Sequence, residues 1–143
     1  MITKFILVLM SLLPILAFGS ESPSIMPHKY HPIYGKWTWT RQVNNCTEVY
    51  EFRTDNTSVV TSGLEIGESS FAISDEPDQN GFYKMTDIVT KDNGKEDCGG
   101  SPTGTPVGDK ATNYILFNPS GDQMIMCEKP SLNACFGPLR RIK

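Results

Sequence analysis

Histidine is the side chain that most often serves as a general base or metal ligand near neutral pH. The chain has two, His28 and His31, and both precede the first segment that resembles a strand. Nucleophilic catalysis needs a base beside the nucleophile, so no serine or cysteine of the folded part has a suitable histidine partner. We therefore expect a protein that is not an enzyme.

Metal binding has two weak candidates. Met26, His28 and His31 offer a thioether and two imidazoles, but without a third fixed imidazole or carboxylate the site would be loose. The segment DEPDQNG at 75–81 gathers acids around a glycine, yet it lacks the alternate ligand spacing of a calcium loop and favours a hairpin turn. We expect neither a metal nor a cofactor.

The four cysteines are Cys46, Cys98, Cys127 and Cys135. Their even number favours disulfides, and the absence of a close Cys-x-x-Cys spacing argues against zinc. Three pairings are available, of which we favour Cys46 with Cys98 and Cys127 with Cys135. The second pair would close a short turn, whereas the first would tie a distant loop to an early strand.

The first residues have the features of a signal peptide. Lys4 precedes an apolar run that is too short to span a bilayer, and Ala17 and Gly19 suit a signal peptidase. We expect 1–19 to be removed and no lipid to be attached, since no cysteine follows the run. The proline-rich segment 20–32 reads as an extended leader. These features predict a periplasmic or secreted protein without a membrane anchor.

The rest of the chain, 33–143, has the length of one domain. The net charge of the sequence is -3, so there is no basic field to attract nucleic acid. We expect a monomer.

This domain is predicted to be all-β. Helical periodicity is absent, whereas apolar and polar residues alternate in short segments separated by turn residues. The predicted strands cover 34–40, 46–53, 58–63, 69–74, 82–90, 112–118, 123–128 and 135–142. A single antiparallel meander of about eight strands closes into a barrel, or alternatively folds into a β-sandwich, because both limit unpaired edges.

One connection, from Lys91 to Lys110, is too long for a tight meander. Cys98 lies in its middle, so a disulfide to Cys46 would pin the loop across the domain. The loop is then either a fixed lid or strap, or an irregular stapled connection, and we favour the latter.

Gly35, Lys36 and Trp37 in the first predicted strand resemble the Gly-x-Trp start of lipocalin-like (calycin) barrels. The resemblance implies that Trp37 plugs the closed end of a barrel, with an arginine of the last strand packed over it. Arg140 or Arg141 stands at that place, and we assign structural roles to Gly35, Trp37 and Arg140. The segment MTDIV also resembles a lipocalin element, but Ile88 replaces its aromatic residue and the usual helix after the barrel is missing.

The segments CTEVYEFRTDNT, DIVTKDNGKEDC and CFGPLRR make the chain similar to a group of small secreted proteins of Gram-negative bacteria. This similarity covers most of the predicted domain and implies secretion. It implies no activity.

Two functions fit these expectations. The first is a non-enzymatic binding protein for a small apolar ligand, because an eight-stranded barrel is just wide enough to hold one. The predicted ligand-binding residues are Trp39, Tyr50, Phe52, Tyr83, Tyr114 and Met124, and Phe71, Met85, Leu116 and Met126 are also predicted to face inward. The alternative is a protein-interaction or inhibitor module that uses disulfide-fixed loops, which lose little entropy on docking.

Overall fold

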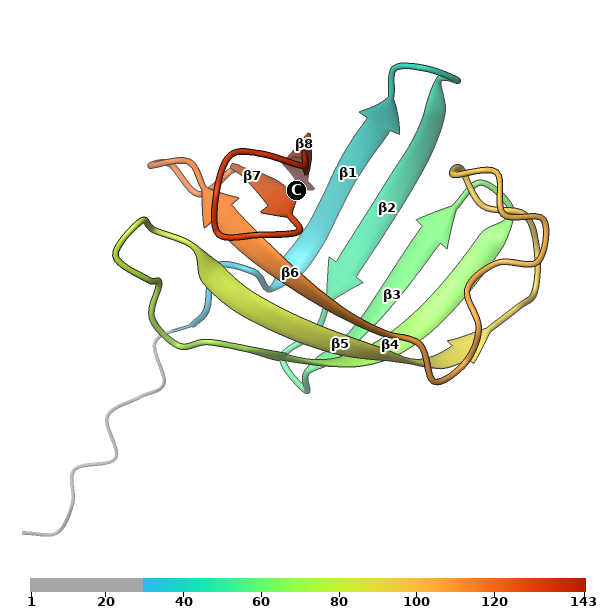
Figure 1. The fold of residues 1–143 in the computed structure, drawn as a ribbon, viewed down its shortest axis with the longest axis horizontal. Helices are drawn as coiled ribbons and strands as arrows, with labels where there is room; N and C mark the ends of the chain where they lie inside the picture. The colour runs from blue at the N-terminus through green and yellow to red at the C-terminus, as the bar shows by residue number, and fades with distance from the viewer. Residues whose placement is uncertain (1–29) are drawn as a thin grey trace, which may run out of the picture.

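A computed structural model describes residues 30–143; the predicted signal peptide, Met26, His28 and most of the predicted leader lie outside the described residues. The described part is a closed barrel of eight antiparallel strands in chain order (Figure 1). The strands are β1 (Gly35–Arg41), β2 (Cys46–Phe52), β3 (Thr57–Ser62), β4 (Glu65–Ile73), β5 (Tyr83–Asp92), β6 (Lys110–Phe117), β7 (Gln123–Cys127) and β8 (Cys135–Ile142). Within residues 30–143, no helix is long and apolar enough to cross a membrane.

The barrel confirms the predicted all-β meander and excludes the sandwich. β8 pairs with β1, with Trp37 opposite Arg141, so the sheet has no free edge. The largest difference is the start of β4, which pairs with β3 from Glu65 onward instead of from residue 69. Gly63 adopts a φ of 61° in the connecting turn, a left-handed conformation that allows a tight hairpin.

The two ends of the barrel differ. We call the end with the connections 53–56, 74–82 and 118–122 the base, and the end with the connections 42–45, 63–64, 93–109 and 128–134 the loop end. The turn at 31–34 closes the base and includes the fully buried Ile33. The segment predicted as a leader therefore contributes His31 and Pro32 to the folded part, which begins before residue 33.

Trp37 is fully buried at the base, where its indole Nε1 donates a 2.8 Å hydrogen bond to the Ile33 carbonyl. The Arg141 guanidinium lies 4.1 Å from the centroid of the Trp37 ring. Arg141 also donates from its three nitrogens to three backbone carbonyls, those of Gly121 (3.1 Å), Tyr34 (2.8 Å) and Pro32 (2.6 Å). This arginine ties β8, the 118–122 turn and the 31–34 turn together.

The structural role assigned to Arg140 was wrong, since Arg141 is the arginine that covers Trp37. Side chains alternate along a strand, so the fully buried Leu139 places Arg141 on the inner face and leaves Arg140 exposed. Gly35 has a φ of 121°, and a Cβ there would lie 2.9 Å from Arg141 Nη1. Glycine is needed at this position both for its conformation and for the space that the guanidinium occupies.

The inner face of β6 also differs from the prediction. Ile115 is fully buried in the core cluster and Phe117 packs against that cluster. Because neighbouring residues point to opposite faces, Tyr114 and Leu116 do not belong to the inner face to which they had been assigned. The apolar run YILF shows no alternation of its own, so its pattern does not indicate which of its residues face inward.

We expect Arg141→Met to destabilise the protein by about 3 kcal/mol or more, because three charged hydrogen bonds to carbonyls and the cation–π contact with Trp37 are lost. Arg140→Met is the matched control and should change the free energy of unfolding by less than about 0.5 kcal/mol. Urea denaturation of the two variants measures the difference. Equal losses would show that Arg141 does not hold the base together.

Candidate functional site: the disulfide-pinned loop end

The long connection between β5 and β6, residues 93–109, runs along the ends of β3 and β4 (Figure 1). We call it the strap. Both expected disulfides are present, Cys46 with Cys98 and Cys127 with Cys135. The first joins the strap to the start of β2, and the second closes the connection between β7 and β8. Each disulfide therefore lies at the loop end.

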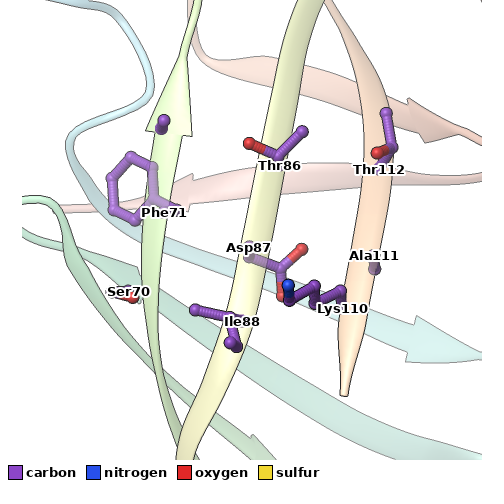
Figure 2. A pocket seen from close by; sticks show the side chains of 9 residues that line it. Ser70, Phe71, Thr86, Asp87, Ile88, Lys110, Ala111 and Thr112 are labelled. Carbon is purple, nitrogen blue, oxygen red and sulfur yellow. The ribbon is translucent and has the colours of Figure 1, made fainter. Parts of the chain in front are cut away.

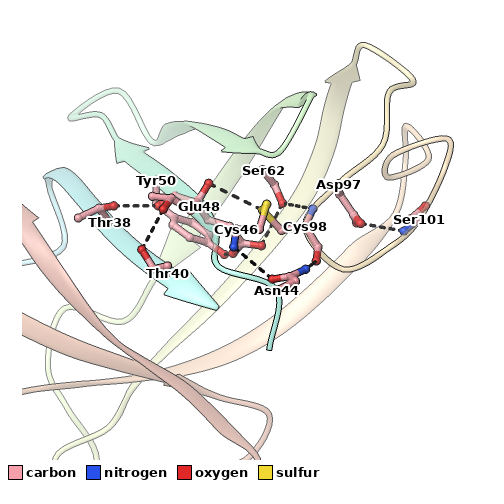
Figure 3. Close-up of a disulfide and its surroundings, with 11 residues drawn as sticks. Thr38, Thr40, Asn44, Cys46, Glu48, Tyr50, Ser62, Asp97, Cys98 and Ser101 are labelled. Carbon is pink, nitrogen blue, oxygen red and sulfur yellow. Dashed lines mark hydrogen bonds between the residues drawn. A yellow bond between two sulfur atoms is a disulfide. The ribbon is translucent and has the colours of Figure 1, made fainter. Parts of the chain in front are cut away.

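Hydrogen bonds fix the middle of the strap on both sides of the first disulfide. The Cys98 backbone N–H donates to Ser62 Oγ, and Asn44 Nδ2 donates to the Cys98 carbonyl (Figure 3). The donor–acceptor distance is 2.9 Å in both hydrogen bonds. The Glu96 carbonyl accepts from the N–H groups of both Leu64 and Glu65 at 3.0 Å. The strap is thus held by the 42–45 turn and by the β3–β4 hairpin.

Asn93 anchors the start of the strap to the same hairpin. Its Oδ1 accepts from the Ile66 N–H at 3.1 Å, and its Nδ2 donates to the Leu64 carbonyl at 3.0 Å. These hydrogen bonds continue the hydrogen-bond ladder between β4 and β5 beyond its last residue pair, Gly67 and Asp92. The strap is therefore a fixed part of the loop end, and of the two interpretations of this loop the pinned strap fits better than the irregular connection.

A buried carboxylate, Glu48, lies beside the Cys46–Cys98 disulfide (Figure 3). Its Oε1 accepts from Ser62 Oγ at 2.9 Å, and its Oε2 accepts from the Tyr50 hydroxyl. Burial, together with the negative charge of Glu48, raises the pKa of the Tyr50 hydroxyl well above its usual value. Tyr50 therefore stays protonated as a donor. Through Ser62 this network continues to the Cys98 backbone.

A second buried carboxyl group, Glu65, lies under the far part of the strap. Its Oε1 accepts a 2.8 Å hydrogen bond from the Thr105 hydroxyl. Burial raises the pKa of Glu65, and the neighbouring carboxyl group of Asp92 raises it further. Asp92 Oδ2 is buried without a hydrogen-bond partner. A proton on one of the two carboxyl groups would reduce the repulsion between them.

The connections at the loop end expose large aliphatic side chains. Each of the four connections carries one, with exposed fractions of 86% for Val43, 67% for Leu64, 64% for Val107 and 72% for Leu132. The 42–45 and 63–64 connections contain no charged residue. In contrast, the connection 74–82 at the base carries Asp75, Glu76 and Asp78 without a basic residue.

A shallow hollow of about 480 Å³ lies on the outer wall of the barrel over β4, β5 and β6 (Figure 2). Phe71 faces the core, where its ring packs against Phe52, so the neighbouring side chains of β4 face outward. The hollow is lined by the small side chains of Ser70, Ala72, Thr86, Ala111 and Thr112 and by the larger side chains of Phe71, Asp87, Ile88 and Lys110. Burial raises the pKa of the Asp87 carboxyl group, and its Oδ1 has no hydrogen-bond partner.

Five of the six predicted ligand-binding residues lie in or against the core of the barrel, and Tyr114 lies on the outer face. Phe52 and Met124 are buried in the core, whereas Trp39, Tyr50 and Tyr83 are partly buried against it. The prediction missed Glu48 and Glu65. Alternation could have found Glu48, because it shares a strand face with Tyr50 and Phe52 in CTEVYEF. Among residues 30–143, no three His, Cys, Asp or Glu side chains are arranged to hold a metal ion.

Glu65→Gln tests the carboxyl pair under the strap. The folded-state pKa of Glu65 lies above the unfolded value of 4.5, so the stability that it contributes is present below that value and is lost as pH rises through the folded-state pKa. Glutamine has no carboxyl group that must lose its proton beside Asp92. We expect the variant to melt at a higher temperature than the wild type at pH 7 and at the same or a lower temperature at pH 3.5. A variant that is less stable at pH 7 would contradict the pair.

No protein-family model matches the chain, and neither a curated protein nor a solved structure matches it.

Proposed function

We propose that the protein is a secreted, non-enzymatic binding module that docks another protein through its loop end. The observation that carries this proposal is the presence of one exposed aliphatic side chain on each of the four loop-end connections. Apolar side chains gathered away from the core are typical of protein interaction sites. The low charge of two of these connections agrees with the depletion of charged residues at interface centres.

The fixed strap supports the same proposal. Docking costs roughly 0.5 to 1.5 kcal/mol for each side chain that is immobilised, and a loop that is already ordered avoids further loss. Val107 and Leu64 are carried by segments that the Cys46–Cys98 disulfide and the Glu96 hydrogen bonds hold in place. The two disulfides also support an oxidising location, either the periplasm or the outside of the cell.

A small apolar ligand inside the barrel has less support. The aromatic side chains of the lower interior pack on one another, with Phe52 and Phe71 centroids 5.4 Å apart and Trp37 and Phe117 centroids 5.8 Å apart. Buried carboxyl groups of Glu48 and Glu65 line the upper interior, where an apolar ligand would leave them without solvation. The loop end is therefore the better candidate.

Site-specific crosslinking tests the docking face. A photoreactive phenylalanine derivative would replace Val107 in one variant and Ile142, which is exposed near the base, in the matched control. In the native host we expect the Val107 variant to form one covalent adduct with a second protein, and the control to form none. Adducts of equal yield from both positions would contradict the proposal.

The adduct identifies the partner, and the purified pair then gives the affinity. Leu64→Ser and Leu132→Ser should each weaken binding by about tenfold if these side chains enter the partner's apolar surface. Both side chains are exposed, so the melting temperature should not change. An affinity that is insensitive to both substitutions would exclude the loop end as the docking face.

A further inference from the structure

Arg41 is the last residue of β1 and lies at the loop end of the barrel. Because side chains alternate along a strand, Arg41 shares the inner face of β1 with Trp37 and Trp39. Successive residues on one face are about 6.6 Å apart, so Arg41 lies beyond both tryptophans, at the opening of the barrel. The 42–45 connection, which carries Val43, begins with the next residue.

Aromatic side chains surround the guanidinium of Arg41. It lies 5.7 Å from the centroid of the Trp39 ring, and the Trp39 and Phe136 centroids are 5.0 Å apart. The Phe136 ring is also near Tyr50, with centroids 6.3 Å apart. Trp39, Tyr50 and Phe136 are each only partly buried. The opening of the barrel therefore combines aromatic surface with one cation.

This cation makes no ion pair. Among residues 30–143, the ion pairs involve the side chains of Lys36, Arg53 and Lys91. Nε of Arg41 is buried without a hydrogen-bond partner. Its two terminal nitrogens also make no hydrogen bond with the described residues, but they are not buried. Arg41 therefore presents its terminal N–H groups to the solvent at the opening of the barrel.

The buried carboxylate of the neighbouring strand does not satisfy Arg41. Both oxygens of Glu48 are already acceptors, one for Ser62 Oγ and the other for the Tyr50 hydroxyl. Burial and the charge of Glu48 raise the pKa of the Tyr50 hydroxyl, and the positive charge of Arg41 opposes that rise. The guanidinium thus lies near this network without bonding to it. An acceptor other than water must come from another molecule.

The acceptor that suits this place is a single carboxylate. Arginine and a carboxylate match in geometry, because two parallel N–H groups can donate to the two oxygens. A phosphate group carries a charge between about -1.5 and -2 at neutral pH, and the nearby Glu48 carboxylate would repel it more strongly. The net charge of -3 also argues against a nucleic acid as the source of phosphate.

The surroundings of Arg41 indicate which kind of carboxylate is presented. Exposed aliphatic side chains stand on all four connections around the opening, so a partner must cover them with a continuous surface. An aspartate or glutamate side chain can lie in the middle of such a surface, whereas a chain terminus interrupts it. Arginine, tryptophan and tyrosine are also the residues that most often contribute strongly at the centre of an interface.

We propose that Arg41 is the charged anchor of the docking face and pairs with an aspartate or glutamate side chain of the partner protein. This inference rests on the proposed docking through the loop end and adds the chemistry of the partner. The partner's acidic side chain is flanked by apolar side chains, which contact Trp39 and Phe136 at the opening and the exposed aliphatic side chains around it.

Nuclear magnetic resonance titration of the full mature chain with capped dipeptides tests the pairing. The probes are acetyl-Leu-Glu-amide, acetyl-Leu-Gln-amide, which lacks only the carboxylate, and acetyl-Leu-Leu with a carboxylate at its C-terminus. We expect the glutamate peptide to shift the Arg41 Nε–H and Trp39 indole resonances saturably, with a dissociation constant of about 10 mM or lower, and the glutamine peptide to bind about tenfold more weakly. No saturable shift with the glutamate peptide, equal binding of the glutamate and glutamine peptides, or tighter binding of the peptide with the C-terminal carboxylate would overturn the proposal.

Variants test the same pairing with the partner that the Val107 crosslink identifies. Arg41→Gln should weaken the affinity by about tenfold, and Arg41→Lys, which keeps the charge, should weaken it less. Added salt should weaken binding of the wild type more than binding of Arg41→Gln, because salt screens the charge pair. Arg53→Gln is the matched control, since Arg53 pairs with Glu51 near the base, and its affinity should be unchanged.

The proposed docking and the proposed anchor fail in different ways. If the Val107 variant forms no adduct, docking through the loop end is wrong and the anchor is wrong with it. If the adduct forms and Arg41→Gln binds the partner with the affinity and salt dependence of the wild type, docking stands and the carboxylate pairing is wrong. A melting temperature of Arg41→Lys equal to that of the wild type shows that any loss of its affinity is not a loss of folding.

Discussion

The contact between Arg141 and Trp37 is the interaction on which the rest of the structure depends. The guanidinium covers the indole and donates to carbonyls of the 31–34 and 118–122 turns. One side chain of the last strand thereby fixes the first strand and closes the sheet on itself. A closed barrel has no free edge. Its inner face is apolar at the base and polar in the half next to the loop end.

That division determines what each end of the barrel can do. The base packs around Trp37 and places Tyr30 and Tyr34 on its outer rim. The upper half contains Glu48 and Glu65, and both accept hydrogen bonds from side chains next to or within the strap. These buried carboxyl groups connect the strap to the barrel wall, and the disulfide between Cys46 and Cys98 adds a covalent link. The exposed aliphatic side chains of the strap and of the β3–β4 turn are therefore carried by backbone that is fixed to the barrel wall.

Much of this fold could be predicted from alternation and turn residues, since all eight strands were found. The number of cysteines predicted two disulfides, and of the three possible pairings the favoured one is present. Alternation fails where a run is uniformly apolar, as at Tyr114 and Ile115, and where two arginines are adjacent, as at Arg140 and Arg141. Docking of the strap could not be predicted, because Asn93 and Ser62 bond to backbone groups that only the closed barrel brings near. The unpartnered Nε of Arg41 likewise depends on packing.

Native-state hydrogen exchange tests most directly whether the strap is a fixed part of the loop end. In the oxidised protein we expect the amides of Leu64, Glu65 and Cys98 to exchange with protection close to that of the barrel strands, since each donates to a fixed acceptor. After reduction of the disulfides under native conditions, the Cys98 amide should lose protection first. Exchange of all three amides at the rate of an open loop in the oxidised protein would contradict the account.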